Sequence, residues 1–262
     1  NNLGTALINL GLKGKRIAVI GENRYEWEIA YLSIVCGTGI VVPLDKSLPA
    51  NELELLIERS NIEAIFYTKK YSDIIQNIKF SEKNKLKHLI SMDNDESFEG
   101  IYSQKELIRE GKKLIEEGNK EFLNAQINPK EMSIMLFTSG TTNAPKGVKL
   151  SQANICADIS SISTWVKIYP TDTLLSFLPI HHTFECTITF LYGTFSGATI
   201  AFCDGLKHIQ KNMQEYKVTI LVAVPLVLET MYKRIQKGIK DQGKEEVIKK
   251  VTKISNGLLK CH

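Results

Sequence analysis

Short runs of apolar, β-branched residues alternate with helical patterns along almost the whole chain. Most of these runs are continuous and do not alternate with polar residues, which is typical of strands covered on both faces. The pattern predicts strands at residues 17–20, 40–43, 64–67, 88–91, 133–137, 174–178, 199–202 and 219–224. It predicts helices at residues 25–36, 50–59, 104–117, 152–165, 183–195, 206–216 and 226–237.

This order of elements favours an α/β protein in which parallel strands are joined by right-handed crossovers, a doubly wound architecture. The helix expected at residues 50–59 follows Pro49 directly, and proline is well placed at the start of a helix. Residues 91–100 are polar and indicate an exposed loop, and a second break is expected at residues 168–172. No internal repeat or low-complexity tract is present.

Composition places the chain among ordinary folded proteins. With 262 residues, 43% of them hydrophobic, it can bury the core of one large domain or two smaller ones. The net charge is +4 and 24% of residues are charged, so neither disorder nor nucleic-acid binding is indicated. The basic residues from Lys233 to Lys260 are mixed with acidic ones, and we interpret them as the solvated face of helices.

The five cysteines lie far apart and form no Cys-x-x-Cys pair. This usage favours reduced thiols in a cytoplasmic protein over disulfides or a zinc site. Residues 186–203 carry no charge, but threonines and glycines dilute them, so we expect a buried helix and a strand. Residues 1–15 lack the apolar core of a signal peptide. We therefore predict a soluble protein.

The segment with the clearest chemistry is Thr-Ser-Gly-Thr-Thr-Asn-Ala-Pro-Lys-Gly-Val at residues 138–148. It follows an apolar run and precedes a helix-like segment that opens at Ser151. A strand that leads into hydroxyls, glycines and one lysine is suited to phosphate, because free N–H groups and hydroxyls surround the anion and the lysine adds positive charge. The candidate residues are Thr138, Ser139, Gly140, Thr141, Thr142, Lys146 and Gly147.

Two other interpretations of this loop are weaker. A Walker P-loop needs Gly-x4-Gly-Lys-Ser/Thr, whereas here Pro145 precedes Lys146 and Gly147 follows it. A polar surface connection is the second alternative, since Ser/Thr/Gly clusters usually connect elements. The Pro-Lys-Gly sequence and the strand before the loop argue against it.

A second informative segment runs from Phe177 to Glu185, where an expected strand ends in Pro179 and two histidines precede a helical pattern. A metal site would need more ligands, and adjacent side chains on an extended segment point apart, so we predict no metal ligand here. From the residues alone, a histidine that caps or packs against the helix stays as good an interpretation as a functional one.

Residues 138–148 closely resemble the signature loop of the adenylate-forming (AMP-binding) enzymes, a family that includes acyl-CoA synthetases. The segment 177–185 resembles the family motif Leu-Pro-x-x-His-x-Phe-Glu, which places the motif histidine on His182 and not on His181. Phe184 and Glu185 are typical of the long-chain fatty acid–CoA ligase branch. The resemblance covers the whole chain.

The resemblance implies two stacked, doubly wound α/β sheets with flanking helices. The first subdomain would span residues 16–166 and carry the phosphate loop, and the second would span residues 167–262 together with residues 1–15. The ligand cleft would lie between them, at the carboxyl ends of the strands, where open α/β sheets usually bind ligands.

The implied reaction is a two-step ligation. A carboxylate attacks the α-phosphorus of ATP to give acyl-adenylate and pyrophosphate, and the thiol of coenzyme A then displaces AMP. The loop hydroxyls would hold the phosphates, Lys146 would neutralise pyrophosphate, His182 would orient the carboxylate, and Mg²⁺ would bridge the phosphates. The expected partners are these small molecules and no nucleic acid. Peripheral membrane contact and oligomeric state stay open.

Several family motifs have no match before His262. They are the aromatic-Gly-x-Thr-Glu motif that stacks on adenine, the aspartate that holds the ribose, and the C-terminal catalytic lysine. We therefore expect an N-terminal portion that cannot complete adenylation by itself. An adenylating enzyme for acetate, an aromatic acid or an amino acid is an alternative. So is a non-catalytic nucleotide-binding module on the same scaffold.

Overall fold

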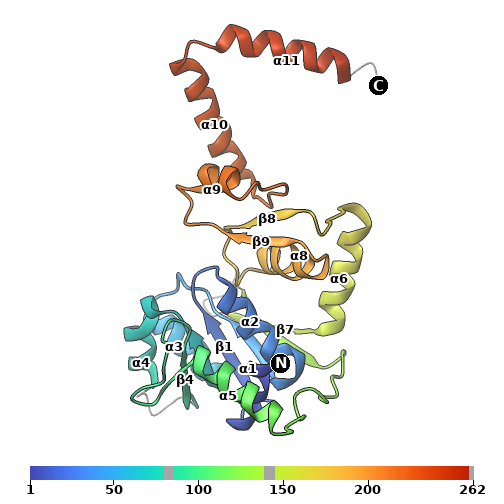
Figure 1. The fold of residues 1–262 in the computed structure, drawn as a ribbon. Helices are drawn as coiled ribbons and strands as arrows, with labels where there is room; N and C mark the ends of the chain where they lie inside the picture. Colours follow the sequence, from blue (N-terminus) through green and yellow to red (C-terminus); the bar gives the residue numbers. More distant parts are fainter. Residues whose placement is uncertain (80–84, 139–144, 260–262) are drawn as a thin grey trace. The chain divides into compact units, whose positions relative to one another are not determined.

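The computed structural model describes residues 1–79, 85–138 and 145–259 (Figure 1). Its internal contacts divide the chain into two compact units, residues 1–220 and residues 221–262. The first unit contains both sheets, and the second consists of two helices.

A mixed sheet of seven strands in the order β5-β4-β3-β1-β2-β6-β7 forms the centre of the first unit. All pairs are parallel except β6 with β7, which are antiparallel. The sequence pattern did not predict β7, which adds one antiparallel strand at the edge of this otherwise parallel sheet. The connection between β6 and β7 is too short for a parallel crossover. The strands are β1 (Arg16–Ile20), β2 (Ile40–Pro43), β3 (Ile62–Tyr67), β4 (His88–Ser91), β5 (Ile101–Ser103), β6 (Met132–Thr138) and β7 (Lys146–Ser151).

Helices cover both faces of this sheet, which explains the continuous apolar runs of its inner strands. In β1, Ile17 and Val19 point into one core cluster, and Ala18 and Ile20 point into the other. Helices α1, α2 and α5 contribute to the first cluster, and α3 and α4 to the second. Their bounds are α1 (Asn2–Asn9), α2 (Tyr25–Ser33), α3 (Ala50–Arg59), α4 (Ser72–Lys79) and α5 (Gln104–Glu116); a π-helix, η1 (Ile34–Thr38), continues α2, and a short 3₁₀ helix, η2 (Lys69–Tyr71), precedes α4.

The connection from β7 to the second sheet is the helix α6 (Gln152–Trp165). Ser151 begins this helix with a capping box: its hydroxyl accepts from the Asn154 N–H at 3.3 Å, and its own N–H donates to Asn154 Oδ1 at 3.0 Å. Such a cap stabilises a helix start by about 1 kcal/mol. The change from strand to helix at Ser151 is therefore encoded locally.

A second, two-stranded parallel sheet pairs β8 (Thr173–Ser176) with β9 (Thr199–Phe202). The crossover between them is helical: α7 (Thr183–Glu185), the π-helix η3 (Cys186–Tyr192) and α8 (Gly193–Phe195) follow one another. The strand expected at residues 219–224 is wrong, since only Ile220 pairs, in an isolated bridge with Leu174. Pro225 begins a helix directly after this segment, which leaves little room for a strand. Helix α9 (Ile209–Glu215) precedes it.

The second unit contains α10 (Pro225–Asp241) and α11 (Glu245–Leu259). Pro225 occupies the first turn of α10, where its missing N–H costs nothing. No residue of α10 is buried within the described chain, and apolar side chains of both helices are exposed, for example Tyr232 and Val251. The helix expected at residues 226–237 is therefore confirmed, but within the described residues none of its side chains is buried in a hydrophobic core.

The expected subdomain boundary near residue 166 stays a prediction. It falls between the last strand of the large sheet, which ends at Ser151, and the first strand of the small sheet, which begins at Thr173. Helix α1 packs closely on α5, where Gly111 lies against the backbone of Asn2. The grouping of residues 1–15 with the second subdomain also stays a prediction. Among the described residues, no helix has both the length and the apolar character needed to cross a membrane.

Candidate functional site

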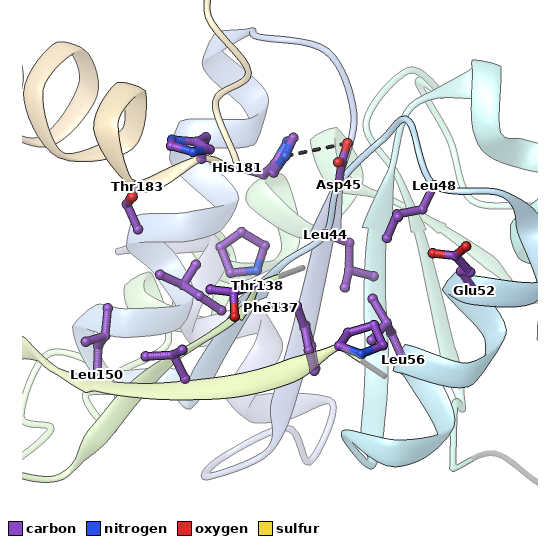
Figure 2. Close-up of a pocket in the computed structure, with 15 residues that line it drawn as sticks. Leu44, Asp45, Leu48, Glu52, Leu56, Phe137, Thr138, Leu150, His181 and Thr183 are labelled. Carbon is purple, nitrogen blue, oxygen red and sulfur yellow. Dashed lines mark ion pairs between the residues drawn. The ribbon is translucent and has the colours of Figure 1, made fainter. Parts of the chain in front are cut away.

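A cavity of about 560 Å³ lies at the carboxyl ends of β2 and β6 (Figure 2). Its wall is mostly apolar and comes from β2, α3, β6 and β7, with Leu56, Phe137 and Leu150 among the lining side chains. Its polar groups come from two directions. Asp45 follows β2, Glu52 lies on α3 and Thr138 ends β6, whereas His181, His182 and Thr183 follow β8.

The described residues on either side of the expected phosphate loop belong to, or adjoin, two paired strands at this cavity. Thr138, the last residue of β6, pairs with Lys146, the first residue of β7, and Gly147 pairs with Phe137. Thr138 lines the cavity, as does Pro145 just before β7. Four predicted residues lie outside the described part of the chain: Ser139, Gly140, Thr141 and Thr142.

Lys146 is exposed and is not itself in the cavity wall. Because side chains alternate along a strand, it shares a face of β7 with Val148 and Leu150. Both of these residues line the cavity. The lysine therefore lies on the cavity side of the hairpin, opposite Thr138.

The two histidines of the second segment both line the cavity, with different neighbours. His182 begins α7, and its Nδ1 accepts a hydrogen bond from the Phe184 N–H at 3.3 Å. His181 lies with Nε2 3.5 Å from Oδ1 of Asp45, as Figure 2 shows. His182 thus caps the helix and also lines the cavity, so the two interpretations left open by the sequence do not exclude each other. No group of three or more His, Cys, Asp or Glu suited to a metal occurs among residues 1–79, 85–138 and 145–259.

Asp45 is held in its ionised form despite partial burial. Burial alone would raise the pKa of this carboxyl, but the N–H and the hydroxyl of Ser47 donate to Oδ1 at 2.8 and 2.7 Å. With His181 and Lys46 nearby, the pKa of Asp45 falls below its usual value. Burial lowers the pKa of His181, which Asp45 partly offsets. At neutral pH the pair is therefore a carboxylate beside a mostly neutral imidazole.

Glu185, the acidic residue of the predicted motif, is completely buried behind this site. Its carboxylate accepts hydrogen bonds from Ser176 Oγ at 2.7 Å and from Thr189 Oγ1 at 3.0 Å. Burial raises its pKa to about 7, against the effect of these donors. Burial also raises the pKa of Glu28 on α2 to about 8, and the charge of Glu185 adds to this.

Sequence reasoning missed Asp45, which lines the cavity, and Asn23 and Ser176, which hydrogen-bond to each other beside the segment that carries the histidines. Each of them is an ordinary polar residue after or within an expected strand, without a motif of its own. The available signal was their place at the carboxyl ends of strands, where ligands bind in open α/β sheets. That signal does not say which polar residues line the cavity and which hydrogen-bond to neighbouring segments.

The α/β fold brings strands β6 and β7 and the histidine segment to one cavity. Residues 1–257 match the family of AMP-binding enzymes, and the chain belongs to this family. The resemblance to the AMP-binding enzymes and the expected α/β fold class are thereby confirmed.

The chain is similar to long-chain fatty acid–CoA ligases over much of its length. It is 31% identical to long-chain-fatty-acid–CoA ligase 6 of Mus musculus over 84% of the chain and 33% of that protein. It is 27% identical to long-chain-fatty-acid–CoA ligase 5 of Rattus norvegicus over 98% of the chain and 40% of that protein. The chain thus spans well under half the length of these relatives.

The fold is also that of a solved long-chain-fatty-acid–CoA ligase from Archaeoglobus fulgidus. The TM-score is 0.76 at 20% identity, over 90% of this chain and 45% of the other. Because the identity is low, this likeness concerns the fold alone.

Proposed function

We propose that the chain is the N-terminal part of an ATP-dependent acyl-CoA synthetase that activates a fatty acid as acyl-adenylate and transfers it to coenzyme A. The supporting observation is that the end of β6 and the motif histidine, 44 residues further on, line one cavity. The fatty acid is favoured because the relatives at 27% and 31% identity are long-chain-fatty-acid–CoA ligases.

In the first step, a carboxylate oxygen of the acid bonds to the α-phosphorus of ATP, and the bond to pyrophosphate breaks. We assign the β- and γ-phosphates to Thr138, Ser139, Gly140, Thr141, Thr142 and Gly147. Lys146 stabilises the negative charge that grows on pyrophosphate as it leaves, which is the largest demand of this step. His182 places the attacking carboxylate near phosphorus, a contribution from orientation.

In the second step, the thiolate of coenzyme A attacks the acyl carbon and AMP leaves with the electron pair of the broken C–O bond. We propose Mg²⁺ as an ion carried on the phosphates of ATP, the way this cation commonly reaches nucleotide-binding enzymes. Bound there, it would reduce the negative charge of the triphosphate.

Two further parts of the proposal concern organisation and compartment. We retain two stacked subdomains, residues 16–166 and residues 167–262 with 1–15. We also assign the protein to the cytoplasm. Four cysteines are free thiols in the described chain, in keeping with a reducing compartment: Cys36, Cys156, Cys186 and Cys203.

The test is carboxylate-dependent exchange of pyrophosphate into ATP by the full gene product, scanned over acids from C2 to C18, aromatic acids and amino acids. Exchange that peaks with medium or long fatty acids is expected. A peak with acetate, an aromatic acid or an amino acid would replace the fatty acid with that substrate. No exchange with any acid would contradict the ligase proposal and favour a nucleotide-binding module.

A matched pair of lysines tests the loop assignment in the same assay. Lys146→Ala should lower the exchange rate about 100-fold or more, as expected when a charged group that stabilises the transition state is lost. Lys149→Ala is the control, because Lys149 is exposed on the same strand but on its other face. Equal losses in the two variants would mean that the rate depends on the total positive charge of β7 and not on the position of Lys146.

A further inference from the structure

We propose that Asn23 is a positioning residue, which sets the place of the His181–His182 segment relative to Thr138 and Lys146. The predicted effect on catalysis rests on the proposed function, whereas the predicted effect on the position of His182 rests only on hydrogen bonds in the structure. Asn23 follows β1 of the large sheet, whereas its partners all belong to the segment that follows or forms β8. It therefore joins the two sheets of the first unit.

Both ends of the Asn23 amide are used. Its Nδ2 donates to the carbonyl of Leu178 at 2.6 Å and to Oγ of Ser176 at 2.9 Å. Its Oδ1 accepts from the N–H of Ile180 at 3.3 Å. A single side chain thus holds the backbone on both sides of Pro179, which leads directly into the histidines.

Backbone hydrogen bonds and burial connect the segment beyond Pro179 to residues 178–180. The N–H of His182 donates to the carbonyl of Pro179 at 2.9 Å, which closes a turn. The carbonyl of His182 accepts from the Cys186 N–H at 3.0 Å, which begins the following helix. Ile180 is buried in the first core cluster. The position of His182 is therefore determined by where residues 178–180 are held.

Glu185 holds the same segment from its other end. Ser176 Oγ accepts from Asn23 and donates to Oε1 of Glu185 at 2.7 Å, so hydrogen bonds connect the partly buried Asn23 through Ser176 to the buried Glu185. A hydroxyl has one proton to donate and accepts through its lone pairs, which matches this direction. These hydrogen bonds span the large sheet, β8 and α7.

This arrangement matters because the candidate site is assembled from two sheets. Thr138 and Lys146 belong to the large sheet, and His182 follows the small one. A displacement of about 1 Å between reacting groups can cost about 100-fold in rate. Asn23 is the side chain that hydrogen-bonds both sides of Pro179 from the large sheet, so its loss should act through His182.

The kinetic test is a double-mutant cycle on the full gene product. Asn23→Ala should lower kcat/KM for the acid about 10- to 100-fold, with KM for ATP changed less than about threefold. In the His182→Ala background, the same change should cost less than about threefold, because a residue that acts by placing His182 has nothing left to place. Fully additive losses would overturn the proposal.

Asn23→Asp separates hydrogen bonding from packing, because it keeps the shape and the acceptor but removes both donors. It should behave like Asn23→Ala. Gln104→Ala is the matched control: Gln104 is a buried amide that donates to the carbonyl of Glu26 at 3.0 Å, away from the cavity. An equal kinetic loss in Gln104→Ala would show that destabilisation alone explains the effect, against the proposal.

A readout that does not need activity distinguishes the two proposals. The imidazole resonances of His182, assigned by their loss in His182→Ala, should shift in Asn23→Ala and stay in place in Gln104→Ala. Unchanged resonances in Asn23→Ala would overturn the positioning role. If the His182 resonances shift in Asn23→Ala as expected but the wild-type protein exchanges pyrophosphate with no acid, the positioning role stands and the ligase proposal fails.

Discussion

Glu28 is a carboxyl group on α2 whose surroundings disfavour its charge. Its Oε1 is buried and has no hydrogen-bond partner among the described residues. Burial, with Glu185 adding negative charge, raises its pKa from 4.5 to about 8. Cys186 lies close enough to have its own thiol pKa, already raised by burial, raised further by the charge of Glu28. At neutral pH Glu28 therefore keeps its proton in the folded protein.

This shift predicts how stability depends on pH. Between pH 4.5, where the unfolded carboxyl titrates, and about pH 8, the folded state holds the proton that the unfolded state has lost. Folding is thus favoured at the acid end of this range, and the free energy of unfolding should fall as pH rises through it. Urea denaturation at pH 5.5, 7 and 8.5 measures the slope.

Glu28→Gln should flatten this slope, since glutamine is neutral in both states, and should stabilise the protein most at pH 8.5. Glu58→Gln is the control, because Glu58 is exposed on α3. The same slope in wild type and in Glu28→Gln would contradict the assignment of the proton to Glu28.

At the site, the sequence predicted the residues that belong to motifs and missed those whose importance lies in hydrogen bonds to residues distant in the sequence. Thr138 and His182 line the same cavity, although that alone does not test their roles. Asn23 could not be found, because its three partners lie more than 150 positions away. Such pairings come from the packing of two sheets and leave no local pattern.

Among the elements, α1 and α5 approach each other unusually closely. At Gly111, a Cβ would meet the carbonyl oxygen of Asn2 and would lie 3.2 Å from the N–H nitrogen of Ala6, all backbone atoms that cannot move aside alone. Glycine is therefore required for contact between the helices and not for backbone freedom. Leu3 and Leu7 of α1 are buried in the first core cluster, so displacing α1 would disturb that core.

Gly111→Ala should destabilise the protein by about 1–3 kcal/mol, the usual cost of overpacking a core. Gly193→Ala is the matched control: it is also helical and buried, but the nearest atoms to its Cβ would lie at 3.5 Å, an ordinary contact. Thermal or urea unfolding compares the two. Equal stability of Gly111→Ala and wild type would mean that α1 can shift without cost.

Element prediction succeeded where one physical cause dominated. The runs at 17–20 and 40–43 became inner strands because every residue there is apolar and both faces are covered. β7 was missed, since Lys146 and Lys149 break its apolar pattern and its pairing with β6 supplies the order. The run at 219–224 failed for the opposite reason: it is apolar, but only Ile220 finds a partner strand.

At the scale of the whole molecule, the two units differ in how much they bury. The strands β1 and β3 are almost fully covered, whereas no residue of α10 is buried. In the 262-residue chain, amide hydrogens of α10 and α11 should therefore exchange with solvent at least about tenfold faster than those of β1 and β3. Hydrogen-exchange mass spectrometry measures this, and equal protection would show that these helices are held by contacts absent here.

β7 is the outer strand of the seven-stranded sheet as described, so a row of its backbone N–H and C=O groups faces away from β6. Such a row is a template onto which an extended segment of another molecule can add, the first step of aggregation. Lys146 and Lys149 place two positive charges on this strand, and an incoming copy would have to bring its own lysines alongside them. The positive charge of Lys146, to which we assign the stabilisation of pyrophosphate, thus also discourages self-association at this edge.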